Sequence, residues 1–260
     1  MRGLIMKKLD FNIIIPARLK SSRLPRKVLH EFFGLPMLEH VRRRALLVEE
    51  VSRVIVATCD DEIYDLISSY GGDVIMTSDR CKSGTERIAE AAKNLSCDYV
   101  ILLQGDEPCF YPKYIESLIS YVKKSKGCFY NLVSPILNKE TLLDTSSVKC
   151  SINSDNEITG CFRKTPYISG FHFQKTFIKK LLGIMCFDRE FLVKNNYLKP
   201  SELSNQESIE QLSLLENKIL MQSLLVNKDI PSLNIYDDIK KLELEFTLKK
   251  QQIILKNILK

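Results

Sequence analysis

The sequence predicts an α/β fold in which a mostly parallel central sheet is flanked by helices. Short apolar runs alternate with segments of helical periodicity from residue 11 to residue 103. Runs such as Tyr99-Val100-Ile101-Leu102-Leu103 lack polar alternation, as expected of strands buried on both faces. Charged segments follow two of these runs directly. Because ligands of open α/β sheets bind beyond the carboxyl ends of the strands, these segments mark the expected site.

The elements of the first half follow from local patterns. The run at 11–15 is halted by Pro16, and the helix at 60–70 begins with acidic residues and ends at Gly71-Gly72. Arg42-Arg43-Arg44, beside apolar residues at helical spacing, is expected on a solvated helix face. The expected order is strand 11–15, helix 37–49, strand 51–58, helix 60–70, strand 74–77, helix 88–94 and strand 99–103.

The second half departs from strict alternation of strands and helices, which favours either a mixed sheet or an inserted subdomain. Ser154-Asp155-Asn156 predicts a hairpin turn within 148–158. The other expected elements are a helix at 113–126, a strand at 131–136, a strand or buried segment at 181–187, a helix at 201–217, and an amphipathic helix, continuous or broken, at 237–260. We expect one domain with a substrate-facing elaboration.

Composition excludes several classes of protein. The net charge of +6 and pI near 8.8 are below what a nucleic-acid-binding domain would show. No apolar segment reaches the roughly eighteen residues of a membrane span, and no signal peptide is visible, so we expect a cytoplasmic protein without membrane contacts. The eight cysteines form no CxxC pair, which argues against a zinc site or a disulfide scaffold and favours buried thiols.

An acidic turn follows the strand at 99–103. Gln104-Gly105-Asp106-Glu107-Pro108 sets two carboxylates at the point where the chain leaves the sheet. Asp106 there could hold a hard cation and its bound phosphate. A solvated acidic turn is the alternative.

A cationic loop follows the strand at 11–15. It carries five cations, Arg18, Lys20, Arg23, Arg26 and Lys27, and the hydroxyls of Ser21 and Ser22. Such a loop can hold a polyphosphate through forked guanidinium donors, a lysine charge and main-chain N–H groups. It is not a Walker loop, and a basic surface loop remains the alternative.

The segment Ser83-Gly84-Thr85-Glu86-Arg87 opens the helix at 88–94. Ser83 or Thr85 can cap this helix, and Glu86 suits its first turn. The same helix start could instead offer N–H donors and Arg87 to an anion or a nucleobase edge.

Four of these segments, in this order, resemble the 3-deoxy-manno-octulosonate (Kdo) cytidylyltransferase family, also called CMP-Kdo synthetases. They are IIPARLKSSRLPRKVL at 14–29, VATCDDEI at 56–63, SGTERIAE at 83–90 and LLQGDEP at 102–108. Weaker matches are VKCSINSDNEI at 148–158, FRKTP at 162–166, LLGIMCF at 181–187, IEQLSLL at 209–215 and NIYDDIKKLE at 234–243.

The resemblance implies a Rossmann-like nucleotidyltransferase fold, similar to glycosyltransferase A. A single domain, 1–260, would have a nucleotide-binding half at about 10–112 and a sugar-facing and dimerisation half at about 113–260. The implied reaction is Mg²⁺-dependent transfer of CMP from CTP to a 2-keto sugar acid, with release of pyrophosphate. A homodimer and a role in lipopolysaccharide or capsule precursor synthesis are implied as well.

The resemblance also assigns residues by motif. Lys27, Asp106 and Arg18 would be catalytic. The nucleotide-binding set is Arg18, Ser21, Lys27, Ser83, Gly84, Arg87 and Gln104. Arg163, Glu210 and Gln211 would face the sugar acid, and Asp106 and Asn234 would hold the metal.

Several positions depart from the family pattern. Arg26 replaces the glycine of RLPGK and either adds a cation for the triphosphate or merely replaces a flexible residue. Asn234 stands where the family's VDTPED segment has its metal-binding aspartate, and Asp237 or Asp238 might substitute for it. Leu181 replaces a histidine, and residues 200–205 depart from PSPLEH. The acceptor could therefore be Kdo, 8-amino-Kdo, another nonulosonic acid or a phosphonate, and a nucleotide-binding protein without catalysis is a further hypothesis.

Overall fold

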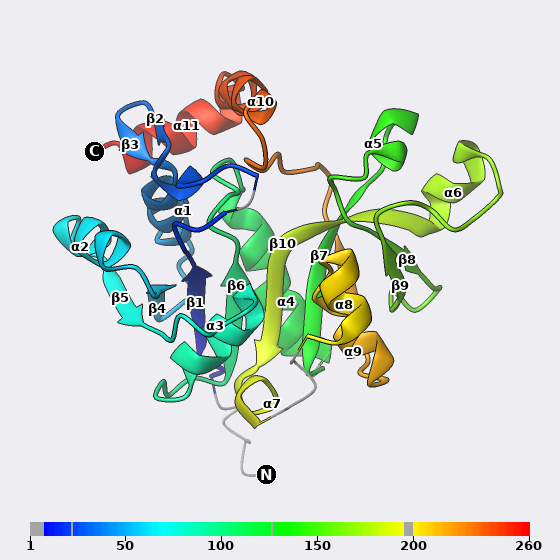
Figure 1. The fold of residues 1–260 in the computed structure, drawn as a ribbon, viewed down its shortest axis with the longest axis horizontal. Coiled ribbons are helices and arrows are strands. Elements are labelled where there is room, and N and C mark those ends of the chain that lie inside the picture. The colour runs from blue at the N-terminus through cyan, green and yellow to red at the C-terminus, as the bar shows by residue number, and fades with distance from the viewer. Residues whose placement is uncertain (1–7, 22, 126, 195–199) are drawn as a thin grey trace, which may run out of the picture.

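The computed structural model describes residues 8–21, 23–125, 127–194 and 200–260. Ser22 of the first loop and Lys126 at the end of an expected helix lie outside them. One sheet runs through both halves of the chain (Figure 1). Its order is β11 (Gln222–Leu225), β7 (Phe129–Pro135), β10 (Ile178–Asp188), β6 (Tyr99–Leu103), β1 (Phe11–Pro16), β4 (Arg53–Thr58) and β5 (Asp73–Met76).

The sheet is mixed, as one of the two sequence-based alternatives predicted. The strands β6, β1, β4 and β5 are parallel, and so are β11 and β7. The long strand β10 runs antiparallel to β6 and β7 and joins the two parallel parts. Its first residues also pair with β8 (Lys149–Ile152), which forms the predicted hairpin with β9 (Ile158–Phe162).

Helices cover both faces of the sheet. Ile13 and Ile15 pack into one core with α1 (Met37–Ala45), α2 (Asp61–Ser69), α4 (Pro112–Ser125), α10 (Asp237–Phe246) and α11 (Lys249–Ile258). Ile14 points to the opposite core, with α3 (Gly84–Ala92), α7 (Arg189–Lys194) and α9 (Gln211–Glu216). This alternation follows from the period of two in a strand. Side chains of the central strands are therefore buried on both faces.

Smaller elements complete the chain. A lobe at the far side from α2 contains β8, β9, α5 (Lys139–Leu143) and α6 (Phe171–Phe177) (Figure 1). A short hairpin of β2 (Glu31–Phe32) and β3 (Leu35–Pro36) precedes α1. The expected helix at 201–217 is interrupted after α8 (Glu202–Glu207), because Ser208 adopts a left-handed conformation with φ 53°. The C-terminal helix is likewise broken, between α10 and α11.

The prediction of a solvated arginine face on α1 is wrong. Arg44 is fully buried, and its Nη1 donates to the Phe110 carbonyl (3.2 Å) and to Gln251 Oε1 (2.6 Å). Arg42 is also buried and forms two 2.7 Å hydrogen bonds with Glu39. The reason is that α11 packs on α1, so this helix lies between the sheet and another helix.

The remaining sequence-based expectations concern thiols and membranes. All eight cysteines lie in the described part of the chain as free thiols, and Cys81, Cys109, Cys150, Cys161 and Cys186 are buried. Burial raises the pKa of the Cys109 thiol to about 12, which agrees with an unreactive side chain. Within the described residues, no helix combines the length and the apolar character needed to cross a bilayer.

Candidate active site

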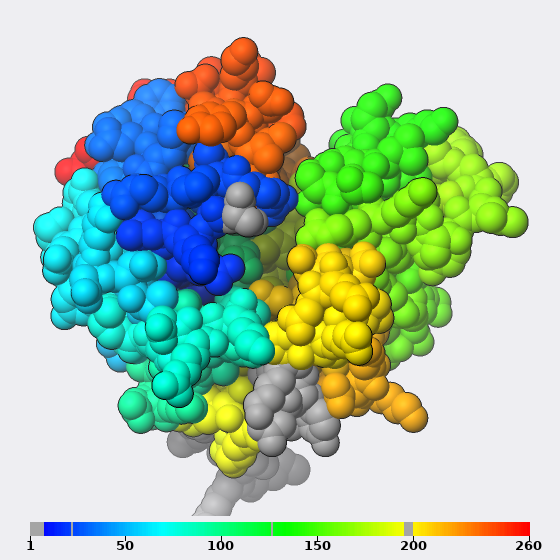
Figure 2. Space-filling model, viewed as in Figure 1, coloured from blue at the N-terminus to red at the C-terminus, as the bar shows by residue number. Residues whose placement is uncertain are grey.

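Two adjoining cavities open where β1 and β6 end. The smaller cavity, about 380 Å³, lies between the cationic loop after β1, the start of α3 and the acidic turn after β6. The larger cavity, about 660 Å³, continues from that turn along β10 toward residues 138–148 and 229–234. Figure 2 shows the hollow between the first loop (blue), α8 (yellow) and the green lobe. Residues lining both cavities are Arg23, Gln104, Asp106, Ser208, Ile209 and Glu210.

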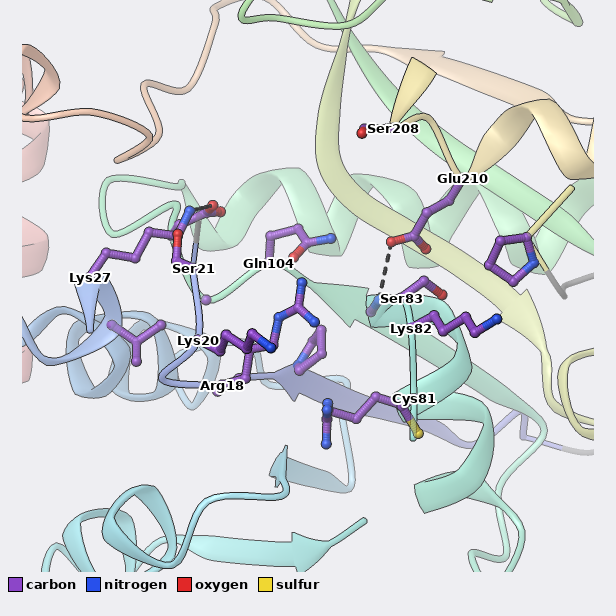
Figure 3. A pocket seen from close by; sticks show the side chains of 18 of the residues that line it. Arg18, Lys20, Ser21, Lys27, Cys81, Lys82, Ser83, Gln104, Ser208 and Glu210 are labelled. Carbon is purple, nitrogen blue, oxygen red and sulfur yellow. Dashed lines mark hydrogen bonds and ion pairs between the residues drawn. The ribbon is translucent and has the colours of Figure 1, made fainter. Parts of the chain in front are cut away.

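All the site residues expected from the sequence line these cavities. Arg18, Ser21, Lys27, Ser83, Gly84, Arg87, Gln104, Asp106 and Glu210 line the smaller one. Arg163, Gln211 and Asn234 line the larger one, with Gln104, Asp106 and Glu210 at the junction. Figure 3 shows how side chains of the first loop, the start of α3 and the acidic turn converge. The fold thus gathers segments that are far apart in the sequence.

An ion pair stands at the junction of the cavities. Lys27 Nζ donates to Asp106 Oδ2 (2.5 Å) and to the Leu233 carbonyl (3.0 Å). The Leu233 N–H in turn donates to the Asp106 carbonyl (2.9 Å). The first loop, the acidic turn and the segment before α10 are therefore fixed to one another at this point. Arg18 and Lys20 add further positive charge to the wall of the smaller cavity (Figure 3).

Arg26 does not belong to this cationic group. Its guanidinium forms two hydrogen bonds with Glu62 of α2, at 2.5 and 2.9 Å, and it lines neither cavity. Its backbone is left-handed (φ 60°), a conformation that glycine adopts at lower cost. The sequence left two roles open for Arg26, contact with a triphosphate or simple replacement of a flexible glycine. The structure favours the second.

The start of α3 is capped twice. Ser83 Oγ accepts from the Glu86 N–H (3.0 Å), as the sequence predicts. Glu210 Oε1 and Oε2 accept from the N–H groups of Gly84 and Thr85, each at 3.1 Å, and Thr85 Oγ1 also donates to Glu210 (Figure 3). The Glu210 carboxylate, from the second half of the chain, thus accepts from the helix N–H groups that the sequence suggested for binding an anion. This contact joins the two halves across the site.

Arg87 lies deeper in the smaller cavity. It is 3% exposed, and its Nη1 donates to Thr77 Oγ1 (2.5 Å) at the end of β5. The same Nη1 is 3.5 Å from the Ser78 carbonyl, so two neutral acceptors hold the buried guanidinium at the cavity wall.

Within the described residues, the hydrogen bonds of Arg163 all go to main-chain carbonyls. Its guanidinium donates to Thr145 O (3.2 Å) and Ser146 O (3.0 Å) on one side, and to Glu207 O (2.8 Å) and Ser208 O (3.0 Å) on the other. The contacts connect the loop before β8 with the interruption between α8 and α9. Desolvation lowers the pKa of Arg163 from its usual value. Arg163 therefore shapes the wall of the larger cavity.

The Asn234 side chain is engaged on both of its polar atoms. Its Oδ1 accepts from Arg23 Nη2 (3.0 Å), and its Nδ2 donates to Ser232 Oγ (2.7 Å). Asp238 Oδ2 accepts from the N–H groups of Asn234 (2.9 Å) and Ile235 (3.1 Å), which ties the segment before α10 to the first turn of that helix. Among the described residues, no group of three His, Cys, Asp or Glu side chains is placed to hold a metal ion.

Two residues that sequence reasoning left without a role contact each other beside Asp106. Glu107 is 5% exposed, and its Oε1 accepts from the Gly183 N–H (2.7 Å). Burial, followed by the nearby charge of Asp106, raises the pKa of Glu107 to about 8. The glycine of LLGIMCF was the only sequence signal, since a glycine inside a strand often marks close backbone approach.

The fold and site define a nucleotidyltransferase: a Rossmann-like sheet whose strands end at a cationic loop, a helix start and an acidic turn around a paired cavity. A profile of the cytidylyltransferase family matches residues 12–230. The chain belongs to this family, and within it to the 3-deoxy-manno-octulosonate cytidylyltransferases.

Individual relatives agree with this assignment. The chain is 37% identical to the 3-deoxy-manno-octulosonate cytidylyltransferase of Chlorobium phaeobacteroides (strain BS1), over 89% of this chain and 95% of that one. It is 34% identical to the mitochondrial enzyme of that name from Arabidopsis thaliana, over 88% and 81%. A solved structure of a CMP:2-keto-3-deoxy-manno-octonic acid synthetase complexed with CTP superposes with a TM-score of 0.82 at 32% identity, covering 90% and 97%.

Proposed function

We propose that the protein transfers CMP from CTP to Kdo and releases pyrophosphate. The observation that carries this proposal is the meeting of two cavities at Asp106, one lined by a cationic loop and one large enough for a sugar acid. Two substrates bound in adjoining cavities react as one complex, which removes much of the entropic barrier. The similarity to a solved synthetase complexed with CTP supports CTP as the nucleotide substrate.

The nucleotide would occupy the smaller cavity. Arg18, Ser21 and Lys27 would bind the triphosphate, because the loop presents their donors on one wall. Ser83, Gly84, Arg87 and Gln104 would face cytosine and ribose. When the acceptor hydroxyl oxygen bonds to the α-phosphorus, the hydroxyl loses its proton, and the bond from the α-phosphorus to the bridging oxygen of pyrophosphate breaks. Negative charge grows on the phosphate oxygens, and fixed cations such as Lys27 stabilise it.

The acceptor would occupy the larger cavity. Gln211 donates through Nε2 to Asn131 Oδ1 (2.9 Å), an orientation that fixes its amide at the cavity wall. Arg163 and Glu210 line the same cavity and supply charge for the acid and hydroxyl groups of a sugar. Leu181 also lines it, in place of the histidine of the family pattern. This apolar side chain favours, as a second candidate, an acceptor that differs from Kdo at the contacted group.

A magnesium ion fits these residues. Mg²⁺ usually binds one or two carboxylates together with substrate phosphates and water, and Asp106 supplies one carboxylate at the cavity junction. Asn234 supplies an amide oxygen, although it lacks the charge of an aspartate. When bound, Mg²⁺ would neutralise phosphate charge. We propose that Asp106 is the principal ligand and Asn234 a weaker one.

A homodimer is proposed as well, and the lobe of α5, α6, β8 and β9 is the surface we favour. It exposes Leu137, Ile168 and Phe173, and exposed apolar clusters often mark association sites. Sedimentation velocity with Ile168→Asp and Phe173→Asp would test it, since both changes should produce monomers. The cytoplasmic location stays a prediction, and one relative, from Arabidopsis thaliana, is named as a mitochondrial enzyme.

The test of the function is pyrophosphate release from CTP and Mg²⁺ with Kdo, in parallel with 8-amino-Kdo and sialic acid. Turnover with Kdo at a higher kcat/KM than with the others supports the proposal. A higher kcat/KM with another acid would support the second candidate, an acceptor that differs from Kdo. Binding of CTP without turnover on any acid would contradict both enzyme proposals and leave a nucleotide-binding protein.

A further inference from the structure

The edge between β6 and β10 contains an irregular pairing at Gly183. The Gln104 N–H donates to the Gly183 carbonyl (2.9 Å), as in an ordinary antiparallel ladder. The Gly183 N–H, however, donates to the Glu107 carboxylate (2.7 Å). The Gln104 carbonyl instead accepts from the Glu107 N–H (3.4 Å) within the acidic turn. The Glu107 side chain therefore takes the place of a main-chain acceptor and continues the ladder beyond β6.

The opposite edge of β10 is irregular at the same position. Its register with β7 shifts between Leu181 and Met185. Asn131 of β7 compensates, because its Nδ2 donates to the carbonyls of Leu182 (2.9 Å) and Ile184 (3.3 Å). Asn131 Oδ1 accepts from Gln211, a residue of the proposed acceptor site. The bulge around Gly183 is thus held from one side by the acidic turn and from the other by the acceptor wall.

There is no space for a side chain at position 183. A Cβ atom at Gly183 would lie 2.6 Å from Gln104 Cγ and 2.8 Å from Glu107 Oε1. The side chain of Gln104 lines both cavities and packs directly on this glycine. The second carboxyl oxygen, Glu107 Oε2, is buried without a partner in the described structure. Such an atom is costly to bury, which points to a functional constraint on the side chain.

We propose that Glu107 is a positioning residue for CMP transfer, which fixes the Gly183 peptide and so aligns the acceptor cavity with Gln104 and the nucleotide cavity. This inference rests on the proposed function for its kinetic test. The role depends on the reach of the carboxyl oxygen to the Gly183 N–H. A side chain of the same length that keeps an acceptor oxygen should preserve it, and a shorter carboxylate should not.

The pair Glu107→Gln and Glu107→Asp separates the length of the side chain from the identity of its carboxyl group. Glu107→Gln retains length and an acceptor oxygen, so we expect the KM for the acceptor and kcat to stay near wild type. Glu107→Asp keeps the carboxyl group but is one methylene shorter, so we expect the acceptor KM to rise by about tenfold or more, as a small misplacement of a substrate can cause. The Kd of CTP should not change in either variant.

Asp188→Ala is the matched control for lost stability. Asp188 lies at the other end of β10, and its Oδ1 accepts from the Phe191 N–H (2.8 Å). This variant should lower Tm without changing the kinetic constants. If Glu107→Asp behaves like Asp188→Ala, or if Glu107→Gln loses activity while Glu107→Asp keeps it, the positioning role is wrong.

A second readout needs no acceptor. Hydrogen exchange of the Gly183 amide should be slow in the wild type and in Glu107→Gln, and faster in Glu107→Asp. Equal exchange in all three proteins would overturn the inference. If the wild type transfers CMP to none of the acids, the proposed function fails, and the exchange result still decides whether Glu107 fixes this peptide.

Discussion

Lys27 and Asp106 form an ion pair of 2.5 Å between Nζ and Oδ2, at the point where the smaller cavity meets the larger one. Both side chains are partly buried, with 16% and 21% of their surface exposed. The fold therefore holds the lysine against the proposed metal ligand. A bound triphosphate would give Lys27 a second set of oxygen partners. The lysine ammonium would then interact with the phosphate oxygens as well as with the Asp106 carboxylate.

Lys27→Met should abolish most of the activity. It removes a fixed cation from the place where phosphate charge grows, and loss of one such group lowers kcat by about 10² to 10³-fold. Steady-state pyrophosphate release, with circular dichroism to confirm folding, measures the effect. Activity within about tenfold of wild type would show that other cations of the loop stabilise the transition state without Lys27.

Arg26→Gly provides the contrast within the same loop. Arg26 pairs with Glu62 outside both cavities, and its left-handed backbone suits glycine. We expect kcat/KM for CTP to match that of the wild type, because a triphosphate in the smaller cavity would not touch this side chain. A clear rise in the KM for CTP would instead place Arg26 among the phosphate-binding cations.

These two neighbours show what the sequence could and could not reveal. A loop of five cations after a strand predicts an anion site, and the carboxyl-end rule correctly placed this loop beside Asp106. The pattern could not tell which cations turn inward, since that depends on the left-handed turn at Arg26 and on Glu62 of a different helix. The prediction of a solvated Arg44 failed for the same reason. The helix that covers this residue, α11, follows about two hundred residues later in the chain.

The second half was less predictable than the first. Alternating strands and helices predict parallel neighbours, but β10 runs antiparallel to three strands, β6, β7 and β8, that come from different parts of the sequence. Its bulge depends on side chains of Glu107 and Asn131, and no local pattern encodes such contacts. The strand β11 and the hairpin of β2 and β3 are too short to show periodicity.

Asn234→Asp should strengthen magnesium binding. It adds a carboxylate to the larger cavity, where the present amide oxygen accepts from Arg23. More ligand charge raises affinity for a hard cation, so the Mg²⁺ concentration for half-maximal activity should fall by about three- to tenfold. Mn²⁺ binding followed by electron paramagnetic resonance gives a readout that is independent of turnover.

The double variant Asn234→Asp with Asp237→Asn controls for net charge, because the exposed Asp237 lines neither cavity. It should behave like Asn234→Asp alone. If the single change leaves Mn²⁺ affinity unaltered, Arg23 neutralises the new carboxylate and position 234 is no metal ligand in this chain.

His40 should make the protein less stable in acid. It is fully buried, with Nε2 2.6 Å from the Phe32 carbonyl and Nδ1 unpartnered in the described structure. Burial is the main cause that lowers its pKa to about 4, with Arg44 and Arg43 adding to the effect.

Between pH 4 and 6.5 the unfolded chain therefore binds a proton at this histidine that the folded protein does not. The free energy of unfolding should fall as the pH drops through this window, by up to roughly 3 kcal/mol from His40 alone. Carboxylates also titrate there, so the informative quantity is the difference from His40→Gln, which can still donate to Phe32 but does not titrate. Urea unfolding at a series of pH values should show a shallower loss for His40→Gln, and parallel curves for the two proteins would mean that His40 is charged in the folded state as readily as in the unfolded chain.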